Sequence, residues 1–366
     1  MLNFFMPTRV LCGIDCLKDH SNVFTTLGSR AFIVTGKKSS AQNGSLNDVR
    51  FILEQNNIHY TLYNEINSNP SIQEVQEAAK IAQKTNPSFI IGIGGGSPLD
   101  AAKAIAILAK NNIDEKQLFS GIYNQQPLPI IAIPTTAGTG SEVTPYAVLT
   151  DNLNETKKSI NSPAIFPKVA FLDAKYTMKL PQEITINTAI DALSHALEGY
   201  LSVKATETSN IFAEKALKIL GKVLPKTLGT LTLEDRVELL YASMLAGVVI
   251  SQTGTTAVHA MGYSLTFYKN IEHGRANGLL LYQYLSFINN YQHELINKVL
   301  SLLNMQTITD FGVLLETLLG PKTSLSKNEL NLFVAKTFQS PNVSNTNPLP
   351  NRQDIENILK NSFIIE

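Results

Sequence analysis

Short apolar runs alternate with amphipathic stretches along the first half of the chain. The runs predict strands at residues 29–36, 58–64, 88–96 and 128–136, and all but the second are almost continuously apolar. Between them, apolar residues recur at helical spacing over residues 43–55, 71–84 and 98–110. This alternation is typical of a parallel sheet covered by helices on both faces. We therefore expect an α/β fold with a Rossmann-like parallel sheet.

The pattern changes near residue 181. Apolar positions then follow helical periodicity over residues 181–202, 210–228 and 235–251, and any further strands are expected to be short pieces. The change predicts a domain boundary at this point. We expect a dinucleotide-binding α/β domain at residues 1–180 and an all-helical domain for metal and substrate at residues 181–366.

Composition and charge narrow the class of protein. Hydrophobic residues make up 44% of the 366 residues, and 30 basic side chains balance 30 acidic ones, so a large core is expected and a nucleic-acid partner is not. Cys12 and Cys16 have neither a second pair nor a nearby histidine, so we expect reduced thiols. The N-terminus lacks a signal-peptide pattern, and no apolar run approaches the roughly 20 residues that span a bilayer. We expect a cytoplasmic protein without a membrane partner.

A glycine-rich turn joins the third predicted strand to a helix, in the stretch GIGGGSPLDAAK at residues 92–103. Successive glycines allow a ligand to approach the backbone closely, and helix N-termini favour anions such as a pyrophosphate. We expect Ser97 to cap the helix, with Pro98 at its first position and Asp100 at its third. The turn departs from the usual dinucleotide fingerprint, because Ser97 replaces the third glycine and the motif comes late in the chain.

A second polar loop, PTTAGTGSEVT at residues 134–144, follows the next predicted strand. It supplies Thr135, Thr136, Thr139 and Ser141. Ligands of open α/β sheets bind outside the carboxyl ends of the strands. The two loops together therefore predict a nucleotide site.

Three histidines and one aspartate are candidates for a metal site. Asp191 and His195 are four residues apart and face one side of a predicted helix, while His259 and His273 lie far along the chain. Three imidazoles and a carboxylate suit Fe(II), Zn(II), Co(II) or Ni(II). The alternative is that these are scattered core or surface side chains. An unpaired carboxylate among apolar neighbours would be costly, and a cation would remove that cost.

These segments resemble the iron-containing, group III alcohol dehydrogenase family over essentially the whole chain. The resemblance is carried, in the family's order and spacing, by GGGSPLDAAKAIA, PTTAGTGSEVTPYAVLT, AIDALSHALEGYLS and VHAMGYSLTFYKNIEHGRANGLLL. It implies a dinucleotide-binding domain, a helical metal domain, a cleft between them (the dehydroquinate synthase-like architecture) and a homodimer. The branch containing 1,3-propanediol dehydrogenase is most similar.

The resemblance also assigns residues. It implies metal ligation, by Fe(II) or by Zn, Ni or Co in its place, at Asp191, His195, His259 and His273. It implies cofactor contacts at Asn69, Gly95, Gly96, Ser97, Asp100, Thr135, Thr136, Thr139 and Lys157, with Lys158 as an alternative to Lys157.

Two positions depart from the family's pattern. Tyr263 stands where most members have a second histidine that is thought to relay protons, and a tyrosine, with a pKa of about 10, is a poorer base. It is therefore a candidate catalytic residue or a residue that lines the pocket. Gly36 stands where strictly NAD-dependent members tend to have aspartate. With Lys37 and Lys38 next to it, Gly36 leaves NADP open beside NAD.

The expected function is metal-dependent interconversion of small primary alcohols or diols and aldehydes, by hydride transfer with NAD or NADP. Apolar and aromatic residues expected near the metal, including Ile250 and Phe267, favour such substrates over a charged acid. A glycerol dehydrogenase-like enzyme, a dehydroquinate synthase-like lyase and a non-enzymatic nucleotide-binding protein are the alternatives. The lyase needs several basic residues for its substrate, and only Lys269 and Arg275 lie near the histidine segment.

Overall fold

The computed structural model describes residues 4–366, which divide into two compact units. One unit comprises residues 5–180, and the other comprises residues 181–366 together with Phe4.

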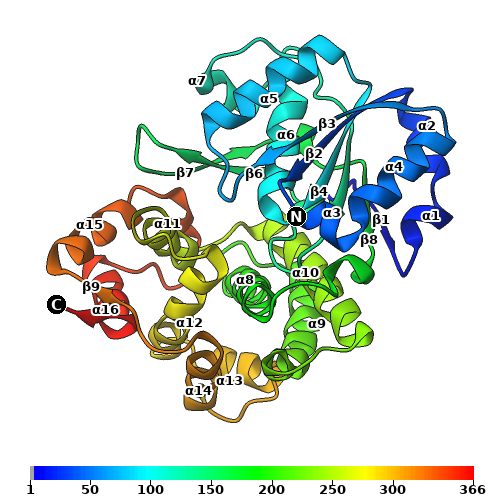
Figure 1. The fold of residues 1–366 in the computed structure, drawn as a ribbon. Helices are drawn as coiled ribbons and strands as arrows, with labels where there is room; N and C mark the ends of the chain where they lie inside the picture. Colours follow the sequence, from blue (N-terminus) through cyan, green and yellow to red (C-terminus); the bar gives the residue numbers. More distant parts are fainter. Residues whose placement is uncertain (1–3) are drawn as a thin grey trace. The chain divides into compact units, whose positions relative to one another are not determined.

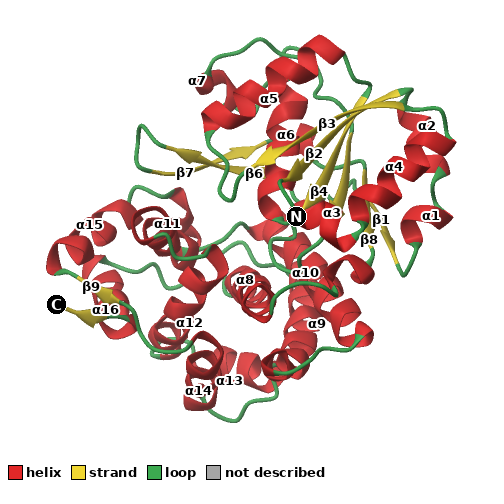
Figure 2. Cartoon of the chain, in the orientation of Figure 1, coloured by secondary structure: helices red, strands yellow, loops and turns green. Residues whose placement is uncertain are grey.

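The unit of residues 5–180 is built on a six-stranded sheet in the order β1-β8-β5-β4-β2-β3, in which every pairing is parallel (Figure 2). Its strands are β1 (Arg9–Cys12), β2 (Arg30–Gly36), β3 (His59–Ile66), β4 (Phe89–Gly94), β5 (Ile130–Pro134) and β8 (Val169–Leu172). The central strands β4 and β5 are buried at every position, which explains why both read as continuous apolar runs.

Helices cover both faces of this sheet (Figure 1). The helices are α1 (Cys16–Asp19), α2 (Asn22–Leu27), α3 (Ser39–Asn43), α4 (Ser45–Gln55), α5 (Ile72–Thr85), α6 (Gly96–Leu108) and α7 (Glu115–Leu118). Successive residues of β2 alternate between the faces: Ile33 packs in the core with α1, α2 and α4, whereas Phe32 and Val34 pack in the core with α5 and α6. The predicted Rossmann-like parallel sheet is confirmed.

The strand order places a switch point between β2 and β4. The chain runs from β2 outward to β3 and then returns to the other side of β2 as β4. Ligands of open α/β sheets bind where connections diverge in this way, beyond the carboxyl ends of the strands. Gly36 ends β2 and Gly94 ends β4 at this point, and the threonine loop follows β5.

Several elements were not predicted from the sequence. The edge pair β1 and β8 has only four residues per strand, and β6 (Tyr146–Asp151) and β7 (Thr156–Asn161) form a separate antiparallel hairpin. The predicted helix at residues 43–55 begins instead at Ser45, because Gly44 has a φ of 93° and separates it from α3. Short 3₁₀ turns lie at η1 (Ser141–Val143), η2 (Pro163–Ile165) and η3 (Ala174–Thr177).

The unit of residues 181–366 is a bundle of nine α-helices with small additions. The helices are α8 (Gln182–Tyr200), α9 (Glu207–Val223), α10 (Leu233–Thr253), α11 (Ala257–Lys269), α12 (His273–Asn289), α13 (His293–Leu302), α14 (Ile308–Leu319), α15 (Lys327–Thr337) and α16 (Arg352–Ser362). The additions are the 3₁₀ turns η4 (Leu224–Leu228) and η5 (Pro341–Asn345) and the strands β9 (Ser324–Leu325) and β10 (Ile364–Ile365). These two strands pair in parallel, so the unit departs slightly from the all-helical expectation.

Helix α8 occupies the middle of this bundle and packs against α9, α10 and α12 (Figure 1). Its residues from Ala189 to Tyr200 are all buried, so polar side chains on this helix are held inside the protein.

Within residues 4–366, no single helix is long and apolar enough to cross a membrane. The pair α10 and α11 meets the length and composition criteria together but bends by 110° between the helices.

Candidate metal centre and cofactor loops

The four residues predicted to bind a metal come from three helices of the second unit. Asp191 and His195 lie one turn apart on α8. His259 lies in the first turn of α11, and His273 is the first residue of α12.

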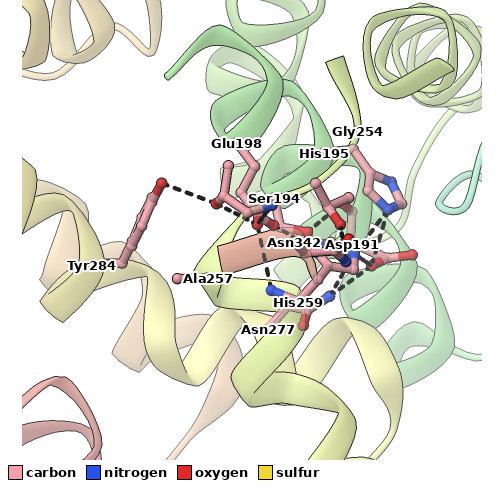
Figure 3. A network of polar contacts seen from close by, with 12 residues as sticks. Asp191, Ser194, His195, Glu198, Gly254, Ala257, His259, Asn277, Tyr284 and Asn342 are labelled. Carbon is pink, nitrogen blue, oxygen red and sulfur yellow. Dashed lines mark hydrogen bonds and ion pairs between the residues drawn. The ribbon is translucent and has the colours of Figure 1, made fainter. Parts of the chain in front are cut away.

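The structure brings the ligand atoms of Asp191, His195 and His259 within 4.8 Å of one another (Figure 3), and His273 lies beside this group. The Asp191 Oδ1 atom lies 3.9 Å from the Nε2 atoms of His195 and His259 and 3.8 Å from that of His273. The two Nε2 atoms of His195 and His259 are 3.0 Å apart. Ligands at tetrahedral positions, 2.0–2.2 Å from a cation, are roughly 3.3–3.6 Å from one another. The separations among Asp191, His195 and His259 bracket this value, so these three residues fit a divalent cation, and His273 is 3.8 Å from the same carboxylate.

The centre is enclosed, with one partly open side. Asp191, His195 and His259 are buried, whereas the His273 side chain is 25% exposed. The separations rule out the alternative of scattered histidines, because segments 64 and 78 residues apart meet at one carboxylate. A buried cluster of nitrogen and oxygen donors is the environment that transition metals favour.

Two glycines let these helices approach one another. A Cβ atom on Gly274, next to His273, would lie 1.9 Å from the backbone oxygen of Asn187 and 3.0 Å from the Asp191 Cβ atom. A Cβ atom on Gly262 would lie 2.2 Å from the Asn277 Oδ1 atom. A larger residue at Gly274 would push the start of α12 away from α8, and one at Gly262 would displace the Asn277 side chain.

Asn277 belongs to the same cluster, although its sequence context did not distinguish it from an ordinary helix residue. Its Nδ2 atom donates to Asp191 Oδ1 at 3.2 Å and lies 3.1 Å from His259 Nε2. Its Oδ1 atom is buried with no hydrogen-bond partner in the described part of the chain. Asn277 therefore restrains the carboxylate of Asp191 from a position against Gly262.

Glu198 is the second residue that the sequence alone does not reveal. It follows His195 by three residues on α8, and its carboxylate contacts the Nδ1 atom of His259 (Figure 3). Burial would raise the pKa of Glu198, but His259 and hydrogen bonds from Thr256 hold it below its ordinary value. The available signal was the spacing of Asp191, His195 and Glu198, which places all three on one face of an otherwise apolar helix.

Tyr263 lies beside the centre. Its ring stacks on His273 with centroids 5.8 Å apart, and it meets the His259 ring edge-on at 6.4 Å. The residue that replaces the family's second histidine is therefore next to the partly open ligand.

In the other unit, the two polar loops pack directly against each other. A Cβ atom on Gly95 would lie 3.1 Å from Thr136 Oγ1, and one on Gly96 would lie 2.6 Å from Thr139 Cγ2. The missing side chains therefore allow the loops after β4 and β5 to lie in contact. Thr135, at the start of the second loop, is buried, and its N–H donates to the carbonyl of Gly94 at 2.9 Å.

The predicted cap of α6 is wrong. The helix begins at Gly96 with Gly95 as its N-cap, and no side chain caps it. Ser97 instead accepts a hydrogen bond from the Asn69 amide at 3.0 Å, and Asp100 accepts from Ser141 at 2.6 Å and from the Val148 amide at 3.0 Å. These contacts across the fold compete with local capping, and they leave the first N–H groups of α6 without a side-chain acceptor.

Asn69 and Lys157 are brought together, and Lys158 is not. Lys157 Nζ donates to Asn69 Oδ1 at 2.6 Å. Lys158 points the other way from the same strand, with its Nζ 3.6 Å from Glu115 and over the ring of Phe119 at 4.2 Å. Because side chains alternate along a strand, only one of the two lysines can lie beside Asn69 and the glycine turn.

Gly36 has room for a side chain. A Cβ atom there would meet its nearest neighbour, the Ile66 carbonyl, at 3.5 Å, which is an ordinary contact. Lys37, Lys38 and Ser39 follow it and are exposed. Gly36, the position expected to bear on the choice between NAD and NADP, therefore lies at the end of β2, with basic side chains next in the chain.

Lys103, on α6, is buried, and its Nζ atom lies 3.9 Å from the Asp100 carboxylate. Lys103 Nζ donates to Ser141 at 2.8 Å and to the Tyr146 carbonyl at 2.6 Å. Burial lowers the pKa of Lys103 to about 8 and raises the pKa of Glu142 to about 7.

The two basic residues near the histidine segment are engaged elsewhere. Lys269 Nζ pairs with Glu329 at 2.9 Å, and Arg275 donates to the Leu319 carbonyl. Neither is left to hold an acidic, phosphorylated substrate, which counts against the lyase alternative.

Comparison with known proteins agrees with this geometry. The model of iron-containing alcohol dehydrogenases matches residues 7–174, and the model of the C-terminal region of the Fe-containing alcohol dehydrogenase family matches residues 185–363. The chain is 34% identical over 291 residues to the 1-propanol dehydrogenase of Citrobacter freundii, covering 78% of this chain and 74% of that protein. It is 30% identical over 282 residues to the NAD-dependent methanol dehydrogenase of Bacillus methanolicus, covering 76% and 74%.

The crystal structure of an iron-containing alcohol dehydrogenase from Thermotoga maritima superposes with a TM-score of 0.94 at 39% identity, covering 99% of each chain. The family resemblance and the expected architecture are confirmed. The chain belongs to the iron-containing alcohol dehydrogenase family and is an alcohol dehydrogenase of that type.

Proposed function

We propose that this enzyme interconverts small primary alcohols or diols and the corresponding aldehydes, with a divalent metal and a nicotinamide cofactor. The observation that carries the proposal is the meeting of Asp191 with His195, His259 and His273 at one buried centre. The relatives that act on 1-propanol and methanol support the size of the substrate.

Asp191 and the three imidazoles would hold the cation, which we propose is Fe(II), with Zn, Ni or Co able to take its place. When bound, the cation supplies a Lewis acid that stabilises negative charge on the alcohol oxygen. The residues of this chain fix its place: Asn277 restrains Asp191, and Gly274 keeps His273 close to α8.

We propose that the cofactor pyrophosphate binds at the N-terminus of α6. The backbone N–H groups of Gly95, Gly96 and Ser97 would donate to it, with the threonine loop alongside. Asn69, which follows β3, and Lys157, on the β6–β7 hairpin, would contact the cofactor beside this turn. The NAD-dependent relative supports NAD, while the absence of an acidic side chain at Gly36 is compatible with NADP.

We propose that the Tyr263 hydroxyl takes part in moving the alcohol proton, since its ring lies against His273 on the partly open side of the centre. Ile250 and Phe267 would supply the apolar surroundings that favour a short alcohol over a charged acid.

A homodimer and a cytoplasmic location are also proposed, on the strength of the family resemblance. Light scattering during size-exclusion chromatography would give twice the chain mass for the dimer. A value equal to one chain mass would exclude the dimer.

The proposed function is tested by NAD(P)H formation at 340 nm with Fe(II)-loaded enzyme. Methanol, 1-propanol, 1,3-propanediol and glycerol are each offered with NAD and with NADP. We expect turnover on the primary alcohols, loss of turnover after chelation, and recovery on adding Fe(II). The His259→Ala variant should lose both metal and turnover, while a His293→Ala control at an exposed position should lose neither. Full turnover by metal-free His259→Ala enzyme would overturn the proposal.

A further inference from the structure

We propose that Glu198 is the positioning residue of the metal centre, because it fixes the tautomer and orientation of His259. This inference rests on the proposed function, since it assumes that His259 binds the metal. Glu198 need not touch metal, substrate or cofactor to act in this way.

The Glu198 carboxylate is fully buried and surrounded by donors. Its Oε1 atom contacts His259 Nδ1. Its Oε2 atom accepts from both the backbone N–H and the hydroxyl of Thr256, each at 2.6 Å, and from the His259 N–H at 3.4 Å. Both oxygens are therefore committed to the N-terminal turn of α11.

This arrangement selects one form of the His259 ring. A carboxylate can only accept hydrogen bonds, so the proton of the neutral imidazole must lie on Nδ1. The lone pair then lies on Nε2, which is 3.0 Å from His195 Nε2 and 3.9 Å from Asp191 Oδ1. A carboxylate behind a histidine ligand is a recurrent way to orient the ring and increase its basicity.

The hydrogen bonds of Glu198 extend through Thr256 to Tyr284 on α12. Thr256 gives its single hydroxyl proton to Glu198, so Tyr284 must donate to Thr256 Oγ1, at 3.0 Å. Tyr284 is buried on the helix that begins with His273. Glu198 on α8, Thr256 at the start of α11 and Tyr284 on α12 thus connect the three helices that carry the four candidate ligands.

A glutamine at this position cannot reproduce the set of contacts. Its side-chain amide has one acceptor end and one donor end, whereas Glu198 meets donors at both oxygens. Either the Thr256 donors or the Nδ1 proton of His259 would lose an acceptor. An aspartate keeps both acceptors and the charge but shortens the reach.

The test compares Glu198→Gln, Glu198→Asp and a control, Glu238→Gln, whose carboxylate pairs with Lys222 at 2.7 Å on the surface of α10. Each is loaded with Zn(II), and the rate of metal loss to a chelator is followed. We expect loss about 10–100-fold faster in Glu198→Gln, partial recovery in Glu198→Asp and no change in Glu238→Gln. The gain in melting temperature on adding Zn(II) should shrink in Glu198→Gln, which a purely structural role would leave unchanged.

A second measurement uses the wild-type enzyme and does not depend on a variant that folds. In Zn(II)-loaded protein with ¹⁵N-labelled histidines, NMR should show His259 with its proton on Nδ1. Equal rates of metal loss in wild type and folded Glu198→Gln, or a His259 proton on Nε2, would overturn the inference. If wild-type enzyme fails to bind metal at all, the proposed function fails instead, so the two failures are distinguishable.

Discussion

Tyr263 lies beside the proposed metal centre, at a position where a second histidine was expected from the family resemblance. Its ring lies parallel to that of His273, with centroids 5.8 Å apart. At this position Tyr263 could transfer a proton or could simply pack against His273. Only proton transfer requires its hydroxyl group.

Replacing Tyr263 with phenylalanine keeps the ring stacked on His273 and removes only the hydroxyl. If the hydroxyl moves the alcohol proton, turnover should fall by about tenfold to a hundredfold while metal content stays unchanged. Turnover against pH, measured with metal content on the same samples, checks this. Wild-type turnover at every pH would reduce Tyr263 to a residue that lines the site.

The neighbouring lysines of β7 offer a matched pair for the cofactor site. Lys157→Met should raise the KM for the nicotinamide cofactor by roughly tenfold, since a charge-assisted hydrogen bond contributes about 1.5–3 kcal/mol. Lys158→Met should leave that KM unchanged, because Lys158 pairs with Glu115. Steady-state kinetics with the cofactor varied at saturating alcohol separates them. If Lys158→Met raised this KM and Lys157→Met did not, Lys158 would be the lysine that contacts the cofactor.

The roles of individual residues could be predicted from the sequence where a local motif or spacing indicated them. The spacing of Asp191 and His195, with the family motifs around His259 and His273, was enough to propose a metal site whose members the fold brings together. Glu198 was not predicted, because a glutamate on a helix is ordinary until its burial and its contact with His259 are known. Ser97 and Asp100 were given local capping roles, but their partners lie 28 to 48 residues away, beyond what local pattern can indicate.

At the level of elements, the closeness of α8 and α12 determines the geometry of the centre. His273 opens α12, and Gly274 allows that first turn to lie against the backbone of α8 near Asp191. The packing of α12 against α8 therefore sets the distance between His273 and Asp191.

Gly274→Ala should therefore weaken metal binding. The added methyl would lie 1.9 Å from the Asn187 oxygen, so α12 must shift away from α8, at a cost of about 1–3 kcal/mol or more. Metal content by mass spectrometry and melting temperature should both fall. Gly229→Ala is the control, since its nearest contact would be 3.7 Å away. Normal metal content in Gly274→Ala would contradict the packing argument.

Elements with long periodic patterns were predicted better than short ones. Strands β2 to β5 and helices α4 to α6 and α8 to α10 have patterns of five residues or more, and these were anticipated to within a few residues. Strands β1 and β8 have only four residues each, and β6 alternates between buried and partly buried positions, so none of them gives a long apolar run. The pairing of β1 with β8 depends on contacts between residues about 160 positions apart, which no local pattern contains.

At the scale of the whole molecule, the fold buries two ionisable side chains, Lys103 and Glu142, inside the unit of residues 5–180. The Oε1 atom of Glu142 is buried and, within residues 4–366, has no hydrogen-bond partner. Burial raises the pKa of Glu142 to about 7 from its ordinary 4.5, so the folded protein holds this proton more tightly than the unfolded chain.

The stability that this proton contributes is present below pH 4.5 and is lost as the pH rises through 7. Glu142→Gln, which stays neutral, should therefore gain stability relative to wild type between pH 5 and pH 8, by up to about 3 kcal/mol. Denaturant unfolding at both pH values measures the difference. For the control Glu77→Gln, on the exposed face of α5, the stability difference from wild type should be the same at pH 5 and pH 8. A Glu142→Gln difference that is equally constant would mean that the carboxylate is not destabilising when charged.

The proposed function requires one metal ion bound by four side chains from α8, α11 and α12. The most direct measurement is an anomalous difference map, recorded at the iron edge, from crystals grown without oxygen in Fe(II). If the four side chains bind iron, we expect a single peak per chain about 2.0–2.4 Å from Asp191 and from the Nε2 atoms of His195, His259 and His273. Iron bound elsewhere in the chain, with these four side chains uncoordinated, would contradict it.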